Sequence, residues 1–124
     1  MAESSNTFHE AEAQLTPATR DMHRALVSLM EELEAIDWYQ QRIDATEDRE
    51  LREILDHNRE EEQEHAAMVL EWIRRRDPKF DANLREYLFT EGRIVGREEE
   101  VTRRNGDARA AAAPGGVGSL RRPR

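Results

Sequence analysis

The 124-residue sequence contains no cysteine, which excludes disulfides, thiolate metal ligands and cysteine nucleophiles. It also lacks any apolar run near the ~18 residues that a membrane span needs. Residues 1–14 lack the basic-then-apolar order of a secretion signal. We therefore expect a soluble protein of the cytoplasm, without a membrane partner, in which any bound metal is held by Asp, Glu and His side chains.

Positive charge is outnumbered by negative charge over most of the chain. The formal net charge is -8, but residues 97–124 hold seven arginines against four acids, so the first 96 residues carry about -11. An acidic surface of this kind argues against a nucleic-acid partner and favours a role with cations, although an ordinary solvated surface can be equally acidic.

The sequence does contain apolar residues at helical spacing, in two long stretches. Thr16 followed by Pro17 is a helix start signal, and the pattern predicts a helix from Pro17 to about Arg42. The acidic segment 44–48 then interrupts the apolar period.

That segment offers Asp44 or Thr46 as the N-cap of a second helix, with acids in its first turn to suit the helix dipole. The second pattern covers about thirty residues and stops at Pro78, because proline cannot continue a helix. A short loop between two long helices predicts that they lie antiparallel as neighbours.

The rest of the chain is divided by changes in composition. Residues 1–15 are polar and too sparse in apolar side chains to predict an element, and a short third helix is expected from Pro78 to Phe89. The hairpin domain is therefore placed at 16–96. Charged residues, an alanine run and Pro-Gly-Gly predict a flexible linker at 97–116, followed by a short terminal peptide at 117–124.

Polar groups interrupt the apolar face that the second helix would bury. Glu32 of the first helix lies among apolar neighbours, at a position that can face the middle of the second helix. An ionised carboxylate in an apolar seam costs several kcal/mol unless a counter-charge is present. On the second helix, steps of four and three place one stripe on a single face: Leu51, Leu55, Asn58, Glu62, His65, Val69 and Trp72.

Two interpretations of these groups stay open. One is a polar hydrogen-bonded layer that specifies helix register, which would make the protein a non-catalytic helical interaction or adaptor module. The other is a metal site, because Glu62 and His65 form a Glu-x-x-His pair of the kind found in di-iron carboxylate bundles. Those bundles need two such pairs and two further glutamates, whereas the two long helices here contain one pair.

A homodimer would supply the missing ligands. Two hairpins give four helices with two copies each of Glu32, Glu62 and His65, and the four carboxylates would balance two divalent irons. This match favours iron, while oxygen and nitrogen ligands also admit manganese, zinc or cobalt. The predicted fold is all-α: an antiparallel two-helix hairpin with a short C-terminal helix, which dimerises into a ferritin-like four-helix bundle.

Three segments, 23–39, 57–68 and 87–92, resemble the encapsulated ferritins, two-helix relatives of ferritin that work inside encapsulin nanocompartments. The resemblance covers about residues 20–92. The terminal Val-Gly-Ser-Leu-Arg-Arg, residues 117–122, is similar to the short peptides that dock cargo into encapsulin shells.

The resemblance implies a ferroxidase, which oxidises Fe(II) to Fe(III) at a di-iron centre between two subunits. It further implies a ring-shaped assembly of dimers, a decamer, inside an encapsulin shell in the bacterial cytoplasm, where the shell stores the iron. The implied site residues are Glu32, Glu62 and His65 from each subunit, with Tyr39 close by, and Glu31, Glu34 and Trp38 as an outer site that attracts incoming iron.

Overall fold

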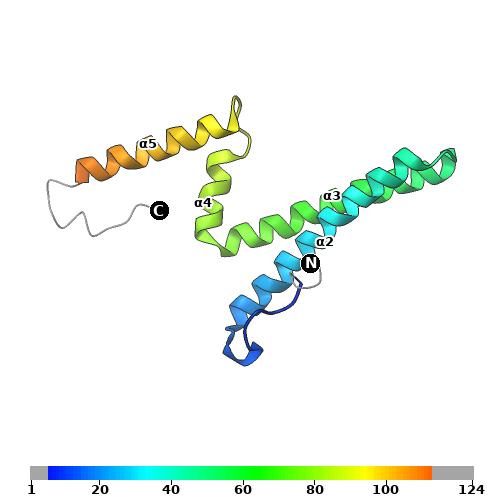
Figure 1. The fold of residues 1–124 in the computed structure, drawn as a ribbon, viewed down its shortest axis with the longest axis horizontal. Coiled ribbons are helices and arrows are strands. Elements are labelled where there is room, and N and C mark those ends of the chain that lie inside the picture. Colours follow the sequence, from blue (N-terminus) through cyan, green and yellow to red (C-terminus); the bar gives the residue numbers. More distant parts are fainter. Residues whose placement is uncertain (1–5, 113–124) are drawn as a thin grey trace. The chain divides into compact units, whose positions relative to one another are not determined.

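Helices account for every regular element in the described part of the chain, which is residues 6–112 of the computed structural model. They are the 3-10 turn η1 (Glu12–Gln14) and the α-helices α2 (Pro17–Ala45), α3 (Arg49–Arg76), α4 (Pro78–Tyr87) and α5 (Ile94–Ala112), labelled in Figure 1. The predicted all-α class is confirmed. None of these helices combines the length and the apolar character needed to cross a membrane. The chain divides after Arg76 into two units, the first with α2 and α3 and the second with α4 and α5.

Helix α2 begins where the sequence predicts and ends slightly later than expected, at Ala45. The Thr16 side chain accepts a hydrogen bond from the amide of Thr19 at 3.1 Å, and proline occupies the first helical position. At the other end, the Thr46 hydroxyl donates to the carbonyl of Arg42 at 2.6 Å. This bond satisfies one of the carbonyls that a helix end leaves without a partner.

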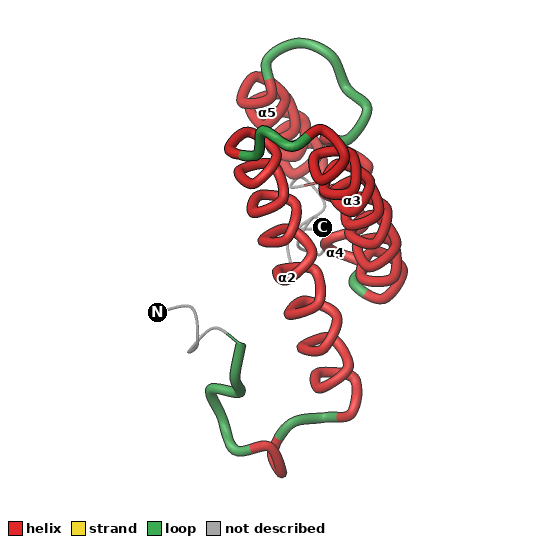
Figure 2. Tube along the Cα trace, turned by 90° about the vertical axis from the view of Figure 1, so that its right-hand side faces the viewer, coloured by secondary structure: helices red, strands yellow, loops and turns green. Residues whose placement is uncertain are grey.

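Helix α3 uses a different cap from the two expected. The Asp48 carboxylate, rather than Asp44 or Thr46, accepts a hydrogen bond from the amide of Leu51 at 2.8 Å. Asp48 directly precedes the helix, where a short carboxylate reaches the third amide. The short connection leaves α2 and α3 antiparallel and side by side, as the hairpin prediction requires (Figures 1 and 2).

The hairpin has a thin core. In the described part of the chain, the buried apolar side chains are those of Ile43, Ala66 and Ile73. Large apolar side chains stay open to solvent on both long helices, among them Leu33 at 54% and Met68 at 57% exposed. A single hairpin therefore leaves much of its apolar surface uncovered, which a stable small domain does not ordinarily do.

The segment before α2, for which the sequence predicted no element, folds back on that helix. The Phe8 and His23 rings lie with their centroids 4.6 Å apart. The His23 Nε2 lies 3.2 Å from the carbonyl oxygen of Asn6. These contacts hold the segment against α2.

Helix α4 starts at the predicted proline and ends at Tyr87, two residues before the predicted end at Phe89. The Asp77 side chain caps it by accepting from the amide of Phe80 at 3.0 Å. Phe89 has a φ of 60° and Gly92 a φ of 85°. Glycine adopts this left-handed conformation freely, whereas a phenylalanine there is strained.

Helix α5 is a correction to the linker predicted at 97–116. Residues up to Ala112 are helical, so the prediction of a flexible segment is wrong for residues 97–112. The reason is local, because arginine, glutamate and alanine are strong helix formers even when their pattern shows no apolar face. Residues 113–116 and the terminal peptide at 117–124 lie outside the described residues.

Candidate metal centre

Three of the predicted site residues meet between α2 and α3. Glu32 comes from α2, and Glu62 and His65 come from α3. One ligand atom of each lies within 4.8 Å of the other two. The His65 Nδ1 is 3.7 Å from Glu32 Oε2 and 3.6 Å from Glu62 Oε2. These distances are too long for hydrogen bonds to the ring, and the three groups lie close enough together that they could hold a metal ion.

The arrangement follows from the two helices. Glu62 and His65 are three residues apart, which places a carboxylate and an imidazole on one face of α3. Glu32 lies near the middle of α2, and the antiparallel hairpin brings it level with that pair. The carboxylates of Glu32 and Glu62 are 23% and 24% exposed, and His65 is 44% exposed. The cluster is therefore only partly covered by its own chain.

The two carboxyl groups disfavour each other's charge. Hydrogen bonding to Glu62 raises the pKa of Glu32 above its usual value, and partial burial and the Glu62 charge add to this effect. His65 acts in the opposite direction and lowers the pKa of Glu32. Raising is the net effect, so a second ionised carboxylate is costly here until a positive charge arrives.

The raised pKa of Glu32 predicts that the stability of the metal-free protein depends on pH. A carboxyl group with a raised pKa binds more protons in the folded than in the unfolded chain. Glu32 makes its full stabilising contribution to the free energy of unfolding at pH values below its pKa in the unfolded chain. This contribution is lost as the pH rises through the pKa of Glu32 in the folded chain. Glu32→Gln should remove this loss, so the variant gains stability relative to wild type as the pH rises to neutral. Urea unfolding at several pH values with a chelator present measures this, and a pH-independent difference between the two proteins would contradict it.

The other predicted site residues lie outside this cluster. Glu31 and Glu34 are exposed on α2, and Trp38 is 51% exposed. Tyr39 is half-buried, seven residues from Glu32 and so on the same face of α2, and the Arg42 guanidinium lies 5.5 Å from its ring centre. The structure thus brings three residues together and leaves the remaining four as separate features of α2.

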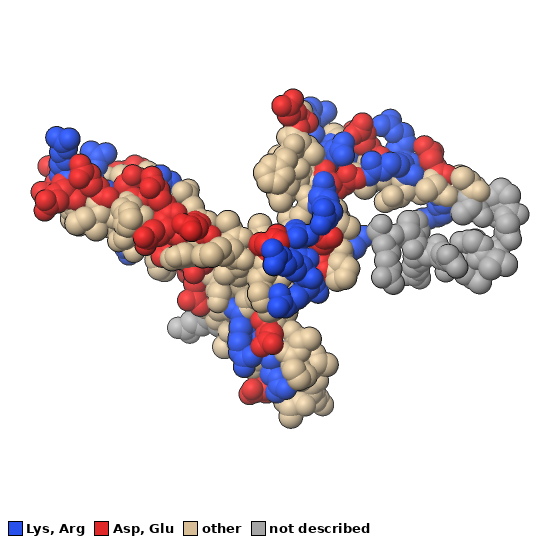
Figure 3. All heavy atoms as spheres, turned by 180° about the vertical axis from the view of Figure 1, so that it is seen from behind, with Lys and Arg blue, Asp and Glu red and all other residues tan. Residues whose placement is uncertain are grey.

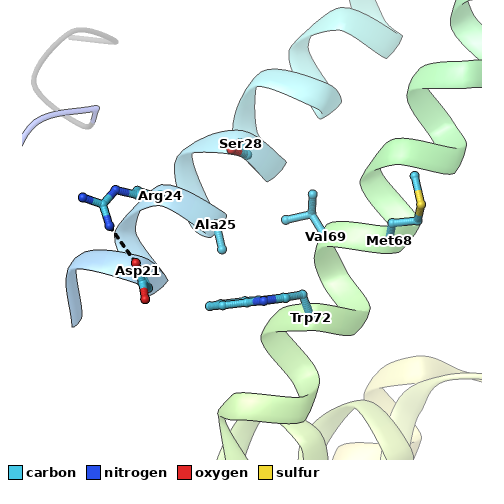
Figure 4. Close-up of a pocket in the computed structure, with 7 residues that line it drawn as sticks. All are labelled: Asp21, Arg24, Ala25, Ser28, Met68, Val69 and Trp72. Carbon is cyan, nitrogen blue, oxygen red and sulfur yellow. Dashed lines mark hydrogen bonds and ion pairs between the residues drawn. The ribbon is translucent and has the colours of Figure 1, made fainter. Parts of the chain in front are cut away.

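The sequence pattern missed a groove further along the hairpin. A space of about 420 Å³ opens between α2 and α3, where the Trp72 ring extends toward α2 (Figure 4). Small side chains on α2 leave this space, and an Asp21–Arg24 ion pair of 2.6 Å lies at its edge. The pattern predicted that the stripe from Leu51 to Trp72 is buried, but Leu51, at the opposite end of α3 from this groove, is 45% exposed. The apolar periodicity identified the face correctly and overestimated how far one chain covers it.

The fold and the three-residue cluster together define a ferritin-like helical hairpin with a carboxylate and imidazole group that could hold a metal. Comparison with known proteins makes the assignment specific, because the family model EncFtn-like matches residues 7–91. The chain belongs to this family of encapsulated ferritin-like proteins. The resemblance inferred from the sequence is confirmed.

Two relatives and one solved structure illustrate the match. The "Encapsulated ferritin-like protein" of Rhodospirillum rubrum is 55% identical over 97% of this chain and 88% of its own length. The "Encapsulin nanocompartment cargo protein EncC" of Myxococcus xanthus is 33% identical over 94% of this chain and 97% of its own. The crystal structure of protein ne0167 from Nitrosomonas europaea is 60% identical, with a TM-score of 0.69 over 70% of this chain and 96% of that one.

Proposed function

We propose that this protein is a ferroxidase that oxidises Fe(II) to Fe(III) at a di-iron carboxylate site formed between two copies of the chain. The observation that carries the proposal is the convergence of Glu32, Glu62 and His65 within 4.8 Å on a half-exposed helical face. Oxygen and nitrogen donors of this kind suit iron, and manganese, zinc or cobalt could occupy the same donors. Membership of an encapsulated ferritin-like family supports the choice of iron as substrate.

A second copy is needed because one chain offers only half of a di-iron ligand set. Such sites use two Glu-x-x-His pairs and two further glutamates, which two hairpins would provide. Large exposed apolar side chains such as Leu33 and Met68 on the same two helices support burial against another chain. Two copies would form the predicted four-helix bundle.

The chemistry asked of these residues is electrostatic. Two Fe(II) ions lose one electron each, and the electron acceptor, dioxygen or hydrogen peroxide, takes the pair together with two protons. The four carboxylates of a paired site favour the higher charge of Fe(III), and His65 of each chain fixes the position of the metal. Tyr39, on the same face of α2, is proposed to lie beside the site and complete its lining.

Two measurements test the proposal on the unmodified protein. Iron bound per chain is measured by elemental analysis after anaerobic loading, and Fe(III) formation is followed by absorbance after dioxygen or peroxide is added. We expect one iron per chain and rapid oxidation relative to the same buffer without protein. A chain that binds no iron, or one that binds iron without accelerating its oxidation, would contradict the proposal.

Glu31, Glu34 and Trp38 are proposed to form an outer site that attracts iron toward the centre. Figure 3 shows acidic side chains gathered over the hairpin, and these two glutamates are exposed. A Glu31→Gln/Glu34→Gln variant should oxidise limiting Fe(II) about two- to fivefold more slowly at low salt, because fewer charges steer the cation. The rate at saturating iron should stay near wild type.

The matched control for the outer site removes two exposed acids elsewhere. Glu98→Gln/Glu99→Gln changes the net charge by the same amount on α5 and should leave the rate at limiting iron nearly unchanged. Equal losses in both variants would show a general charge effect. A loss in the Glu31/Glu34 variant that persists at saturating iron would place these residues in the oxidation step instead.

We further propose that the protein works as cargo inside an encapsulin nanocompartment in the bacterial cytoplasm. Two relatives are named for encapsulation and for cargo of such a compartment. The terminal segment at 117–124 would bind the shell protein, and the dimers would assemble into a ring-shaped decamer. The shell would then store the oxidised iron.

The alternative is a non-catalytic helical adaptor in which the same polar groups set the pairing of helices. The thin core and the exposed apolar face favour some association of chains under either reading. The two functions differ in one measurable respect. An adaptor would change its oligomeric mass when Glu62 is replaced, without any bound iron to lose.

A further inference from the structure

The second unit contains an ionic contact between α4 and α5 that the proposed iron chemistry does not use. The Glu86 carboxylate, in the last turn of α4, accepts a hydrogen bond from Arg97 Nη2 at 2.9 Å and forms an ion pair with Arg104. Arg97 Nε also donates to the backbone carbonyl of Glu86 at 3.1 Å. We call these three residues the Glu86 clasp.

The geometry of the clasp ties α5 to α4 over two helical turns. Arg97 and Arg104 are seven residues apart and so lie on one face of α5. Arg97 reaches both the carboxylate and a carbonyl in the last turn of α4, where carbonyls lack intrahelical partners. The Glu86 side chain is 20% exposed, so this charge is held mostly out of water by its partners.

Apolar packing between α4 and α5 is too slight to hold the two helices together without the clasp. Among the described residues of α4 and α5, no apolar side chain is fully buried. Interleaved acidic and basic side chains cover the surface along α5 in Figure 3. The connection between the helices passes through Phe89 and Gly92, both at positive φ, and carries Leu88 at 45% exposure. The angle between α4 and α5 therefore depends on charge-assisted hydrogen bonds, which are the stronger kind.

We propose that the Glu86 clasp is a conformational lock that fixes the orientation of α5 relative to α4. The orientation of α5 becomes variable when the clasp is removed or when salt screens its charges. Glu86 is thus a positioning residue for α5. Because residues 113–124 follow α5 in the chain, the clasp would also orient the end of α5 to which the proposed shell-binding segment is joined. Only this last consequence rests on the proposed function.

The absence of native cysteine permits a direct distance measurement on the full chain. Asn83→Cys on α4 and Thr102→Cys on α5, both exposed positions, would carry spin labels. The labelled chain is diluted into an excess of unlabelled chain, so that pulsed electron resonance reports distances within one chain. We expect a narrow distribution in the otherwise unmodified protein.

Glu86→Gln should shift this distribution to longer distances and broaden it. The matched control is Glu100→Gln, which removes another Arg97 partner, at 3.2 Å, without touching α4. This control should keep the narrow distribution. Far-UV circular dichroism verifies that both variants keep the helix content of the parent.

The parent chain in about 1 M salt, where the screening length falls to ~3 Å, provides a test without any change at the clasp. The distance should shift in the same direction as in Glu86→Gln and by a smaller amount, because salt screens a partly covered ion pair less than an exposed one. An unchanged distribution in Glu86→Gln, an unchanged distribution in high salt, or an equal shift in Glu100→Gln would overturn the lock. None of these measurements uses iron or a shell, so a negative result would leave the proposed ferroxidase function unaffected.

Discussion

Glu62→Gln is expected to lower the rate of Fe(II) oxidation by more than about 100-fold. The loss of a side chain that only hydrogen-bonds to a metal ligand already costs ~10–100-fold in metal affinity or activity. Glu62 is proposed as a direct ligand, so its loss should cost more. A paired site would lose one carboxylate from each chain, and with them half of the negative charge that balances two divalent irons. Stopped-flow absorbance of Fe(III) formation, with one and two irons per chain, measures the effect.

The matched control is Glu60→Gln, an exposed glutamate two residues away on the same helix. It should oxidise iron at nearly the wild-type rate, because it removes the same charge from α3 without touching the cluster. Iron bound per chain should fall in Glu62→Gln and stay constant in Glu60→Gln. A Glu62→Gln protein that keeps wild-type oxidation would end the assignment of this cluster as the site.

The hairpin was predictable because its determinants are local. Thr16 and Pro17 start α2, Pro78 follows the end of α3, and a short polar segment separates the two apolar periods. The predicted cap of α3 was wrong, and α2 ends slightly later than expected, at Ala45. Asp48 reaches the third amide of α3 because it stands immediately before the helix, whereas Thr46 instead closes the end of α2.

The cluster was partly predictable. The spacing of Glu62 and His65 places them together on any α-helix, so this half needs no knowledge of the fold. Glu32 required the register of the hairpin, which the short connection between α2 and α3 fixes. Periodicity alone cannot show what covers that face. The 44% exposure of His65 shows that a pattern identifies an apolar stripe without saying which chain buries it.

The second unit was less predictable, for a physical reason. Helix α5 has no apolar stripe, and its arginines and glutamates predict a solvated linker. Helix propensity and side-chain pairs such as Arg97–Glu100 stabilise it without a buried face. The Glu86 clasp joins residues eleven and eighteen positions apart across a bend, and no sequence period marks such a contact.

The raised pKa of Glu32 links the cluster to the proposed assembly. In a single chain the two carboxyl groups already disfavour a second charge. Pairing two chains through this face would bring two more carboxylates close and increase the repulsion. Association and metal binding should therefore be coupled, since a cation that relieves the repulsion also stabilises the pair.

Zinc, which cannot be oxidised, is accordingly expected to strengthen pairing of the chains by about 100-fold for each ion that the pair binds, equivalent to ~2.7 kcal/mol per ion, when it exceeds its dissociation constant ~100-fold. Sedimentation velocity across protein concentrations, with zinc or with a chelator, measures this shift without any redox step. The Glu32→Gln/Glu62→Gln variant lacks the repulsion as well as the charged ligands. Its metal-free pairing should be at least as strong as that of the wild type, and zinc should change it little.

Glu60→Gln/Glu61→Gln serves as the control for this variant, because it removes two charges from the exposed side of α3 and should keep the response to zinc. Identical mass distributions of the wild type in zinc and in chelator would contradict the coupling. An undiminished zinc response in Glu32→Gln/Glu62→Gln would move the metal away from this cluster. The expected pattern of tighter metal-free pairing with a lost zinc response distinguishes a shared metal site from a polar register layer, because removing the groups of such a layer weakens specific pairing.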